Sequence, residues 1–413
     1  MNQKTLIGLG VAALVAIGAA VALNHSNRPQ SGQAEASAYL VPELRDHVND
    51  VAKVVVTGAD SKVVATLERG ANGWTLAEKG GYPADTGKLR AFLLKLADAR
   101  RVEQKTSNKD KYALLGVEDV AAKDAKGLQV ELDGLAKPLV LVVGNADPRG
   151  GTYVRVAGQP ESWLVSTSLA VDKNGADWLR KDLADIAATR IAAVAITHAD
   201  GSKVAIAKNA EGDANYVLAD VPKGREAGSE FAINGLAAAL AGLRFDDVVA
   251  AKDAMPPEQA LKARYATFDG IVVDVTAWEK DGKSYAQFAA SLDAAQADKG
   301  IAAEQAKAKA DYDAESAAAD ATKKEGKADA AVTPVKPASI DDAAKDRETR
   351  LAALNKDVAD LGTRFSGWTY VLPAYKYANI NKSMSDLLKP LDDKKAAPAA
   401  KPPAKPAKVG AAH

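Results

Sequence analysis

The feature that most constrains the fold of this chain is an internal repeat. Residues 51–67 read VAKVVVTGADSKVVATL, and residues 191–207 read IAAVAITHADGSKVAIA. In each segment an alternating apolar run leads through a Gly/Asp turn into a second alternating run, a pattern typical of a β-hairpin. The letters WTL at 74–76 and YVL at 216–218 then follow the two hairpins. The sequence therefore predicts one β-rich unit that occurs twice.

The repeat continues into a helix. In both copies three leucines recur at the i, i+4, i+7 spacing of one buried helix face. They are Leu89, Leu93 and Leu96 in the first copy, and Leu236, Leu240 and Leu243 in the second. Asp85 and Asn234, which precede the two leucine stripes, are the predicted N-caps because their side chains can accept a bond from the first turn.

Three further pairs of segments follow in the same order. They are the Gly-led strands 127–132 and 270–275, the Trp-containing strands 162–165 and 367–371, and a polar-capped helix around 168–184 and 379–389. We therefore expect an α+β fold made of two tandem repeats of one module. Each module should combine an antiparallel sheet with helices, and the two should cover residues 48–187 and 188–390.

The second module carries an insertion at 292–364 that the first lacks. Its first half is dominated by Ala, Lys, Asp, Glu and Gln, which favour a helix but offer little to bury. Ser339, with Asp342 three residues later, predicts the start of a second helix. That helix has apolar residues at the 3-4-3 spacing of a short coiled coil, namely Leu351, Leu354, Val358 and Leu361. We expect an inserted α-helical hairpin, either as a solvated ornament or as a docking arm for a partner.

An uncharged apolar run at 5–23 argues for a membrane anchor. Nineteen helical residues span about 28 Å, close to the hydrocarbon thickness of a bilayer. We expect 1–30 to form an N-terminal transmembrane helix and 31–47 a linker, with the protein in the inner membrane and most of the chain periplasmic. A cleaved signal peptide is the alternative, since AVA at 20–22 has the form of a cleavage site.

Composition and motifs argue against several functions. Lys+Arg and Asp+Glu balance at 54 each, so nucleic-acid binding is not expected. The chain has no cysteine, and its four histidines do not show metal-ligand spacing. Phosphate-binding and hydrolase motifs are also missing. We expect neither an enzyme nor a cofactor or metal site, and we expect the Pro/Ala/Lys-rich tail at 391–413 to be disordered.

Few residues stand out as candidates for contact with a partner. Arg149 and Arg155 lie beside the Gly-rich turn at 144–151 and could contact an anion, although a structural role is the simpler interpretation. The apolar residues of the predicted second helix could contact a protein partner if they are not used within the hairpin. Those residues are Leu351, Leu354 and Val358.

Several short motifs resemble an uncharacterised bacterial family of membrane-anchored exported proteins, often encoded beside gliding-type ABC transporter subunits. Besides the N-terminal apolar segment, they are WTL at 74–76, YALLGV at 112–117, VVGNADPRGGTYVR at 142–155 and SWLV at 162–165. The resemblance implies an extracytoplasmic accessory to a transport or envelope complex, and it brings no catalytic residues.

The sequence thus predicts a non-catalytic, membrane-tethered protein whose partner is a subunit of an ABC-type transporter. The alternative is a binding module for an envelope polymer or a small anion, which would use the Gly-rich turn and the Lys-containing tail.

Overall fold

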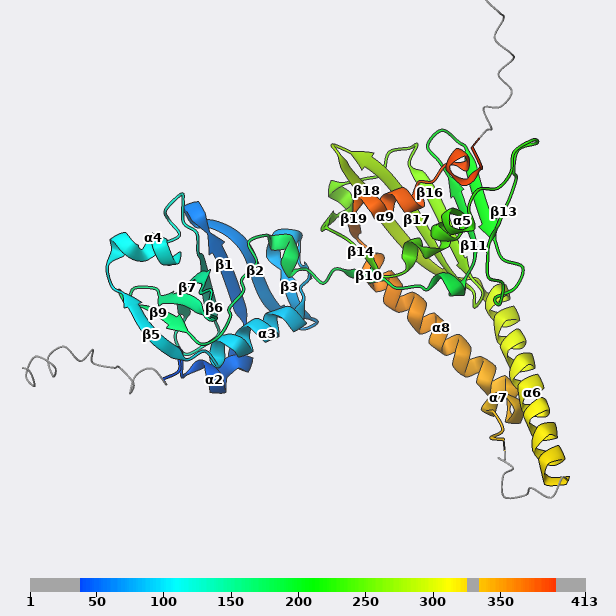
Figure 1. Cartoon of the computed structure of the whole chain (residues 1–413), viewed down its shortest axis with the longest axis horizontal. Helices are drawn as coiled ribbons and strands as arrows, with labels where there is room; N and C mark the ends of the chain where they lie inside the picture. The colour runs from blue at the N-terminus through cyan, green and yellow to red at the C-terminus, as the bar shows by residue number, and fades with distance from the viewer. Residues whose placement is uncertain (1–37, 325–333, 391–413) are drawn as a thin grey trace, which may run out of the picture. The chain divides into compact units, whose positions relative to one another are not determined.

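The computed structural model describes residues 38–324 and 334–390. They form two compact units, unit 1 and unit 2, which divide between Arg180 and Lys181 (Figure 1). The predicted anchor at 1–30, residues 31–37 of the predicted linker and the tail at 391–413 lie outside the described residues. Within the described part of the chain, none of the helices combines the length and apolar composition that crossing a bilayer requires.

Unit 1 is built on a nine-stranded antiparallel sheet with the order β4-β3-β2-β1-β6-β7-β8-β9-β5. Its strands are β1 (Lys53–Gly58), β2 (Lys62–Gly70), β3 (Gly73–Leu76), β4 (Tyr82–Pro83), β5 (Arg101–Thr106), β6 (Leu128–Asp133), β7 (Leu139–Ala146), β8 (Thr152–Val156) and β9 (Ser162–Val165). Alternate residues of β1 and β6 are buried, because one face of the sheet forms the core. The long helix α3 (Thr86–Ala97) buries its leucine stripe together with Phe92.

Unit 2 is built on an eight-stranded antiparallel sheet with the order β13-β12-β11-β16-β17-β18-β19-β15. Its strands are β11 (Ile191–Thr197), β12 (Lys203–Ala207), β13 (Val217–Leu218), β15 (Asp247–Ala250), β16 (Leu261–Thr267), β17 (Ile271–Lys280), β18 (Lys283–Leu292) and β19 (Trp368–Leu372). The short strands β10 (Asp182–Ala184) and β14 (Leu243–Arg244) pair with each other. Because β14 belongs to unit 2, this pairing places the unit boundary ahead of the predicted one at 187/188.

The strands of the two sheets follow a corresponding spatial order. In each, the first hairpin lies between a short third strand, β3 or β13, and a later strand, β6 or β16. Leu67 lies opposite Val54 and Leu76, and Ile206 lies opposite Val194 and Leu218, so the registers also correspond. The sequence match of 127–132 with 270–275 is off by one strand, because the partner of β11 is β16 rather than β17.

The helix caps were predicted with mixed success. Asp85 caps α3, since its Oδ1 accepts a bond from the backbone N–H of Lys88 at 2.9 Å. The prediction for Asn234 is wrong, because Ser229 caps α5 (Glu230–Ala237). The side chain of Asn234 instead accepts from the N–H of Tyr216 at 3.0 Å and so fastens the preceding strand to the helix.

The helix expected around 168–184 is wrong. The segment forms one 3-10 turn, Gly175–Trp178, and ends in strand β10. Trp178 is buried edge-on against Phe92, at 6.5 Å between ring centroids, and backbone bonds tie the segment to residues 83–85. An extended crossing makes these bonds, whereas a helix would use its backbone groups internally. Around 379–389 the chain forms α9 (Ala374–Ile380), which starts earlier than expected, and a 3-10 turn.

The described residues of the insertion form α6 (Ala294–Lys324), α7 (Ala338–Asp341) and α8 (Ala343–Phe365), which we call the arm. Figure 1 shows α6 and α8 extending away from the sheet of unit 2, with α7 at their far end. The start of α8 differs from the prediction, because Asp342 caps it by accepting from the N–H of Lys345, while Ser339 lies in α7. Leu354 and Leu361 are buried and Leu351 and Val358 half-buried, but α8 lies against β18 as well as α6.

Candidate functional site

Two of the motifs that carry the family resemblance, YALLGV at 112–117 and VVGNADPRGGTYVR at 142–155, come together in space. The one-turn helix α4 (Tyr112–Leu115) packs over β7 and β8, where Tyr112 and Val117 form a buried cluster with Val142. Glycines allow this close approach. A Cβ at Gly144 would collide with the carbonyl oxygen of Leu115. The motifs are therefore explained by packing of a loop segment on the sheet.

Arg155 lies inside this contact and is 4% exposed. Its Nε donates to the carbonyl oxygen of Val117 at 2.8 Å, its Nη2 pairs with Asp119, and its guanidinium lies 4.8 Å from the centre of the Tyr112 ring. All of these partners belong to the loop that covers β8. Arg155 therefore has a structural role, and little of its guanidinium is accessible to an external anion.

Arg149 lies on the turn between β7 and β8, and its side chain is 77% exposed. Its Nε is 3.3 Å from Oδ1 of Asp147, a buried carboxylate that also accepts a bond from the Tyr153 hydroxyl. The hydrogen bond from the Tyr153 hydroxyl is the main cause that lowers the pKa of Asp147, and the hydrogen bonds from Arg149 lower it further. The bond between Tyr153 and Asp147 also raises the pKa of Tyr153. Because Asp147 compensates its charge, Arg149 is a weaker anion site than an unpaired cation would be.

The predicted contact residues of α8 divide between two environments. Leu354 is only 9% exposed, so it is not available to a partner, whereas Leu351 and Val358 are half-buried. Polar bridges join the helices of the arm, including Arg347 Nη2 to Asp298 Oδ1 at 2.7 Å. Near the sheet, Phe365 contacts Phe288 of β18, with ring centroids 5.3 Å apart. The apolar face of α8 therefore holds the arm in place, and its outer face is polar.

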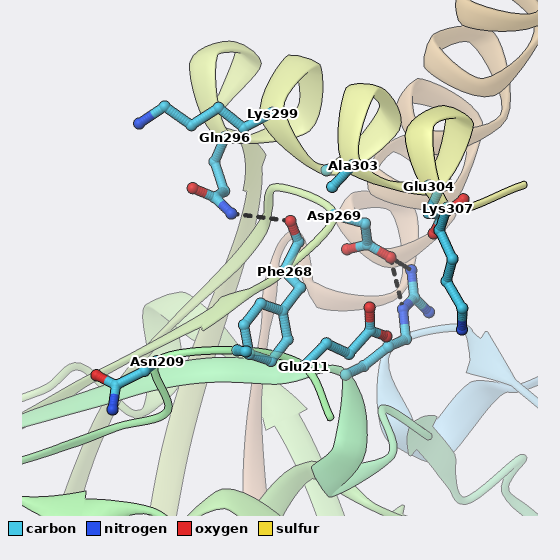
Figure 2. Close-up of a pocket in the computed structure, with 12 residues that line it drawn as sticks. Asn209, Glu211, Phe268, Asp269, Gln296, Lys299, Ala303, Glu304 and Lys307 are labelled. Atoms are coloured by element: carbon cyan, nitrogen blue, oxygen red, sulfur yellow. Dashed lines mark hydrogen bonds and ion pairs between the residues drawn. The ribbon is translucent and has the colours of Figure 1, made fainter. Parts of the chain in front are cut away.

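A cleft of about 570 Å³ lies where the arm meets the sheet, and we call it the arm-root cleft. One wall is the first half of α6, and the other is the loop at 209–211 after β12. The turn between β16 and β17 closes the cleft (Figure 2). Its lining residues are Arg190, Asn209, Ala210, Glu211, Phe268, Asp269, Gln296, Lys299, Gly300, Ala303, Glu304 and Lys307. All belong to unit 2.

Two contacts fix the geometry of this cleft. Gln296 Nε2 donates to the carbonyl oxygen of Phe268 at 2.9 Å, and a Cβ at Gly300 would come within 2.7 Å of the same oxygen. A glycine is therefore required for α6 to pack this closely on the turn. This glycine, inside an otherwise alanine-rich helix, is the one sequence signal that could have indicated the site.

Three of the six charged side chains that line the arm-root cleft are held in ion pairs: Arg190, Asp269 and Glu304. Arg190 lies 2.8 Å (Nε) and 2.7 Å (Nη2) from Oδ2 of Asp269, and 3.9 Å from Asp357 of α8. Glu304 pairs with Arg350. These ion pairs connect the sheet, the turn and both arm helices, so they contribute to holding the arm.

Unit 1 has a pocket of about 600 Å³ at the corresponding corner of its sheet, which we call the corner pocket. It lies between the segment before β1 and the turn joining β6 to β7. The lining residues are Val41, Glu43, His47, Asp50, Leu135, Ala136, Lys137, Pro138 and Leu139. His47 Nδ1 lies 2.6 Å from Asp50 Oδ2 there. Among the residues described, no group of three His, Asp or Glu side chains is placed to hold a metal ion.

Comparison with known families gives one match. Residues 74–263 match a domain of unknown function, DUF4340. The match begins in β3 of unit 1 and ends in β16 of unit 2, so it includes parts of both units and stops before the arm. It agrees with the resemblance to an uncharacterised family. No curated protein and no solved structure matches the chain.

Proposed function

We propose that this protein is a non-catalytic, membrane-tethered extracytoplasmic accessory protein that docks on an ABC-type transport or envelope complex. The arm is the observation that carries the proposal. In unit 1, residues 157–161 suffice to join β8 to β9, whereas the arm joins β18 to β19 in unit 2. A connection this long is not needed to close the sheet, and it lies outside the DUF4340 match.

The contacts of the arm support a docking role. Its base is fixed by the aromatic contact between Phe365 and Phe288, and its two long helices are joined by ion pairs and by Gln305, whose Nε2 lies 2.9 Å from Asp346 Oδ2. A segment held in one orientation loses little conformational freedom when it binds. A rigid projection is therefore better suited to docking than a loose loop of the same length.

The membrane location and the type of partner rest on the sequence. The apolar run at 5–23 supports a tether with the N-terminus inside, and the resemblance supports an ABC-type partner. Alkaline phosphatase fused after Asn49 should be active, because the chain beyond the anchor should lie outside the cytoplasm. An inactive enzyme together with an active cytoplasmic reporter at the same position would reverse the topology.

The docking proposal is tested by shortening the arm while keeping its base. Excision of the whole insertion would remove Leu361 and the α8 surface that covers β18, so the cut is placed where the helices meet. A four-glycine linker from Lys307 to Ala343 removes α7 and the outer part of α6 but keeps the bridges of Gln305 and Arg350.

The full chain, tagged and solubilised in mild detergent, should co-purify with the ATPase or permease subunits of a transporter. The shortened chain should fold, reach the membrane and lose these subunits. Lys309→Glu, a single change on the removed part of α6, controls for surface charge. If the shortened chain keeps all the partners, the outer part of the arm does not dock and the binding surface lies in the retained part of the chain.

We also propose that the two units arose by duplication of one module. The corresponding strand order and registers support this, and so does one side-chain contact. Arg155 of β8 donates to the carbonyl oxygen of Val117 in the segment after β5, and Gln287 of β18 lies 3.5 Å from the carbonyl oxygen of Ala254 after β15. An experimental structure in which the two units fail to superpose strand for strand would refute the duplication.

A further inference from the structure

The arm-root cleft has two cations that the fold does not use. Lys299 and Lys307 are exposed, and neither has an ion-pair partner within 38–324 and 334–390. By contrast, Arg190 and Glu304 in the same cleft are both paired. Apart from these two lysines and the paired groups, Glu211 is the one other charged residue among the lining residues that the structure describes. The α6 wall of the cleft is therefore positively charged.

The spacing of the two lysines shows what they can bind. Lys299, Ala303 and Lys307 follow each other at intervals of four residues, so they lie along one side of α6. The eight-residue separation corresponds to about 12 Å along the helix axis. Figure 2 shows the two lysine side chains extending from opposite ends of the α6 segment that lines the cleft, with Ala303 between them.

A single small anion does not fit this arrangement. Lysines 12 Å apart along a helix do not converge on one phosphate or carboxylate, and the guanidinium of Arg190 is already held by Asp269 at 2.7 Å. A chain with negative charges at intervals does fit. In an extended peptide, with about 3.3 Å per residue, carboxylates four residues apart are separated by about 13 Å and point to the same side.

We propose that the arm-root cleft binds an extended acidic segment of the partner protein. Two carboxylates of the segment, four residues apart, pair with Lys299 and Lys307, and a small residue between them lies over Ala303. On the facing wall the side-chain amide of Asn209 is available to the peptide backbone of the segment. This inference rests on the proposed docking function and specifies the chemistry of the partner.

The test uses the full chain in nanodiscs and a fluorescein-labelled ten-residue Gly/Ser/Thr peptide with two glutamates four residues apart. Fluorescence anisotropy at low salt should show binding that weakens as ionic strength rises, because the lysines are exposed. The same peptide with glutamines should bind at least tenfold more weakly. Moving the glutamates to adjacent positions should also weaken binding, since only one could then reach a lysine.

Variants assign the binding to the cleft. The double variant Lys299→Glu/Lys307→Glu should lower the affinity for the acidic peptide at least tenfold. Lys309→Glu is the matched control, because Lys309 lies on the same helix but pairs with Asp313 at 2.6 Å and does not line the cleft. It should change the affinity less than twofold. Circular dichroism should show the same helix content in all three proteins.

Two outcomes would overturn the inference. In the first, the peptide fails to bind, or binds equally well to the double variant. In the second, an oligogalacturonate probe binds through the lysines while the peptide does not, which would assign the cleft to an acidic polymer. In both cases the shortened-arm experiment still decides separately whether the arm docks. If the shortened chain loses the partner subunits but the double variant keeps them, the docking proposal is supported and the acidic-segment inference is refuted.

Discussion

Replacement of Arg155 by Met separates the two roles that the sequence leaves open for this residue. The side chain of Met keeps much of the aliphatic volume but removes every N–H. The buried carbonyl of Val117 then loses its donor, now 2.8 Å away, at a cost of about 1–3 kcal/mol. Loss of the guanidinium beside the Tyr112 ring adds about 0.5–2 kcal/mol.

Two smaller contributions complete the estimate for Arg155→Met. The side chain of Asp119 is 73% exposed, so loss of its ion pair costs at most about 1 kcal/mol. Removal of a buried charge relieves a desolvation penalty and acts in the opposite direction. The free energy of unfolding of unit 1 should therefore fall by about 2–4 kcal/mol. Asp119→Asn should cost about 1 kcal/mol or less.

Urea denaturation measures the free energy of unfolding of both variants, with a separate fluorescent reporter in each unit. Because the chain has no cysteine, one cysteine at the exposed position of Lys95 accepts a dye that reports on unit 1, and a cysteine at Lys283 reports on unit 2. Only the unit 1 transition should move. Equal costs for the two variants, or a cost below about 0.5 kcal/mol for Arg155→Met, would refute the structural role and restore Arg155 as a candidate contact for an anion.

Three further substitutions test other buried groups. The hydroxyl of Tyr265 is buried without a hydrogen-bond partner among the described residues. In urea titrations Tyr265→Phe should leave the free energy of unfolding unchanged or raise it by up to about 2 kcal/mol. A clear loss of stability would instead show that the hydroxyl has a partner. Tyr153 lowers the pKa of Asp147, so the ionised carboxylate stabilises the fold above the unfolded-state pKa of about 3.9. Asp147→Asn should therefore be destabilising at pH 7, with a cost that shrinks as the pH falls below about 4; a constant cost would contradict this. Gly127→Ala should cost about 1–3 kcal/mol in thermal denaturation because its Cβ would collide with a backbone carbonyl, whereas Gly212→Ala, in open space, should cost little.

The parts of the fold that could be predicted are those fixed by local pattern. Alternating apolar residues and a turn predict the hairpins at β1–β2 and β11–β12, although the register of the first one shifts between Val56 and Thr57. Asp85 caps α3 for the same local reason. Both features depend on residues that are close together in the sequence, so one sequence is enough to predict them.

The parts that could not be predicted depend on distant neighbours. Asn234 has the right chemistry for a cap, but its side chain bonds to the backbone of Tyr216, which only the folded unit brings near. The segment before residue 181 is extended because Trp178 packs on Phe92 of α3. Lys299 and Lys307 are ordinary surface lysines in the sequence. They become a candidate site only when the turn at Phe268 and the loop at 209–211 form the rest of the cleft.

The two pockets show how the corresponding corners of the two sheets differ. Asp50 immediately precedes the first segment of the repeat in unit 1, and Arg190 immediately precedes it in unit 2; each lines the pocket at the corner of its sheet. In unit 1 the corner is covered by the segment before β1, and five of the nine lining residues are apolar. In unit 2 the corner is covered by α6, and the lining is charged.

At this corner α6 therefore supplies a wall in unit 2 that the segment before β1 supplies in unit 1, while the strand orders of the two sheets correspond. Arg190 contacts Asp269 on the turn and Asp357 on α8, so one side chain links the sheet to the far helix of the arm. A solvated ornament would not require such a link, because its position would not matter. An arm that presents Lys299 and Lys307 to a partner would require it, since the distance between the two walls of the cleft decides whether a peptide can bind.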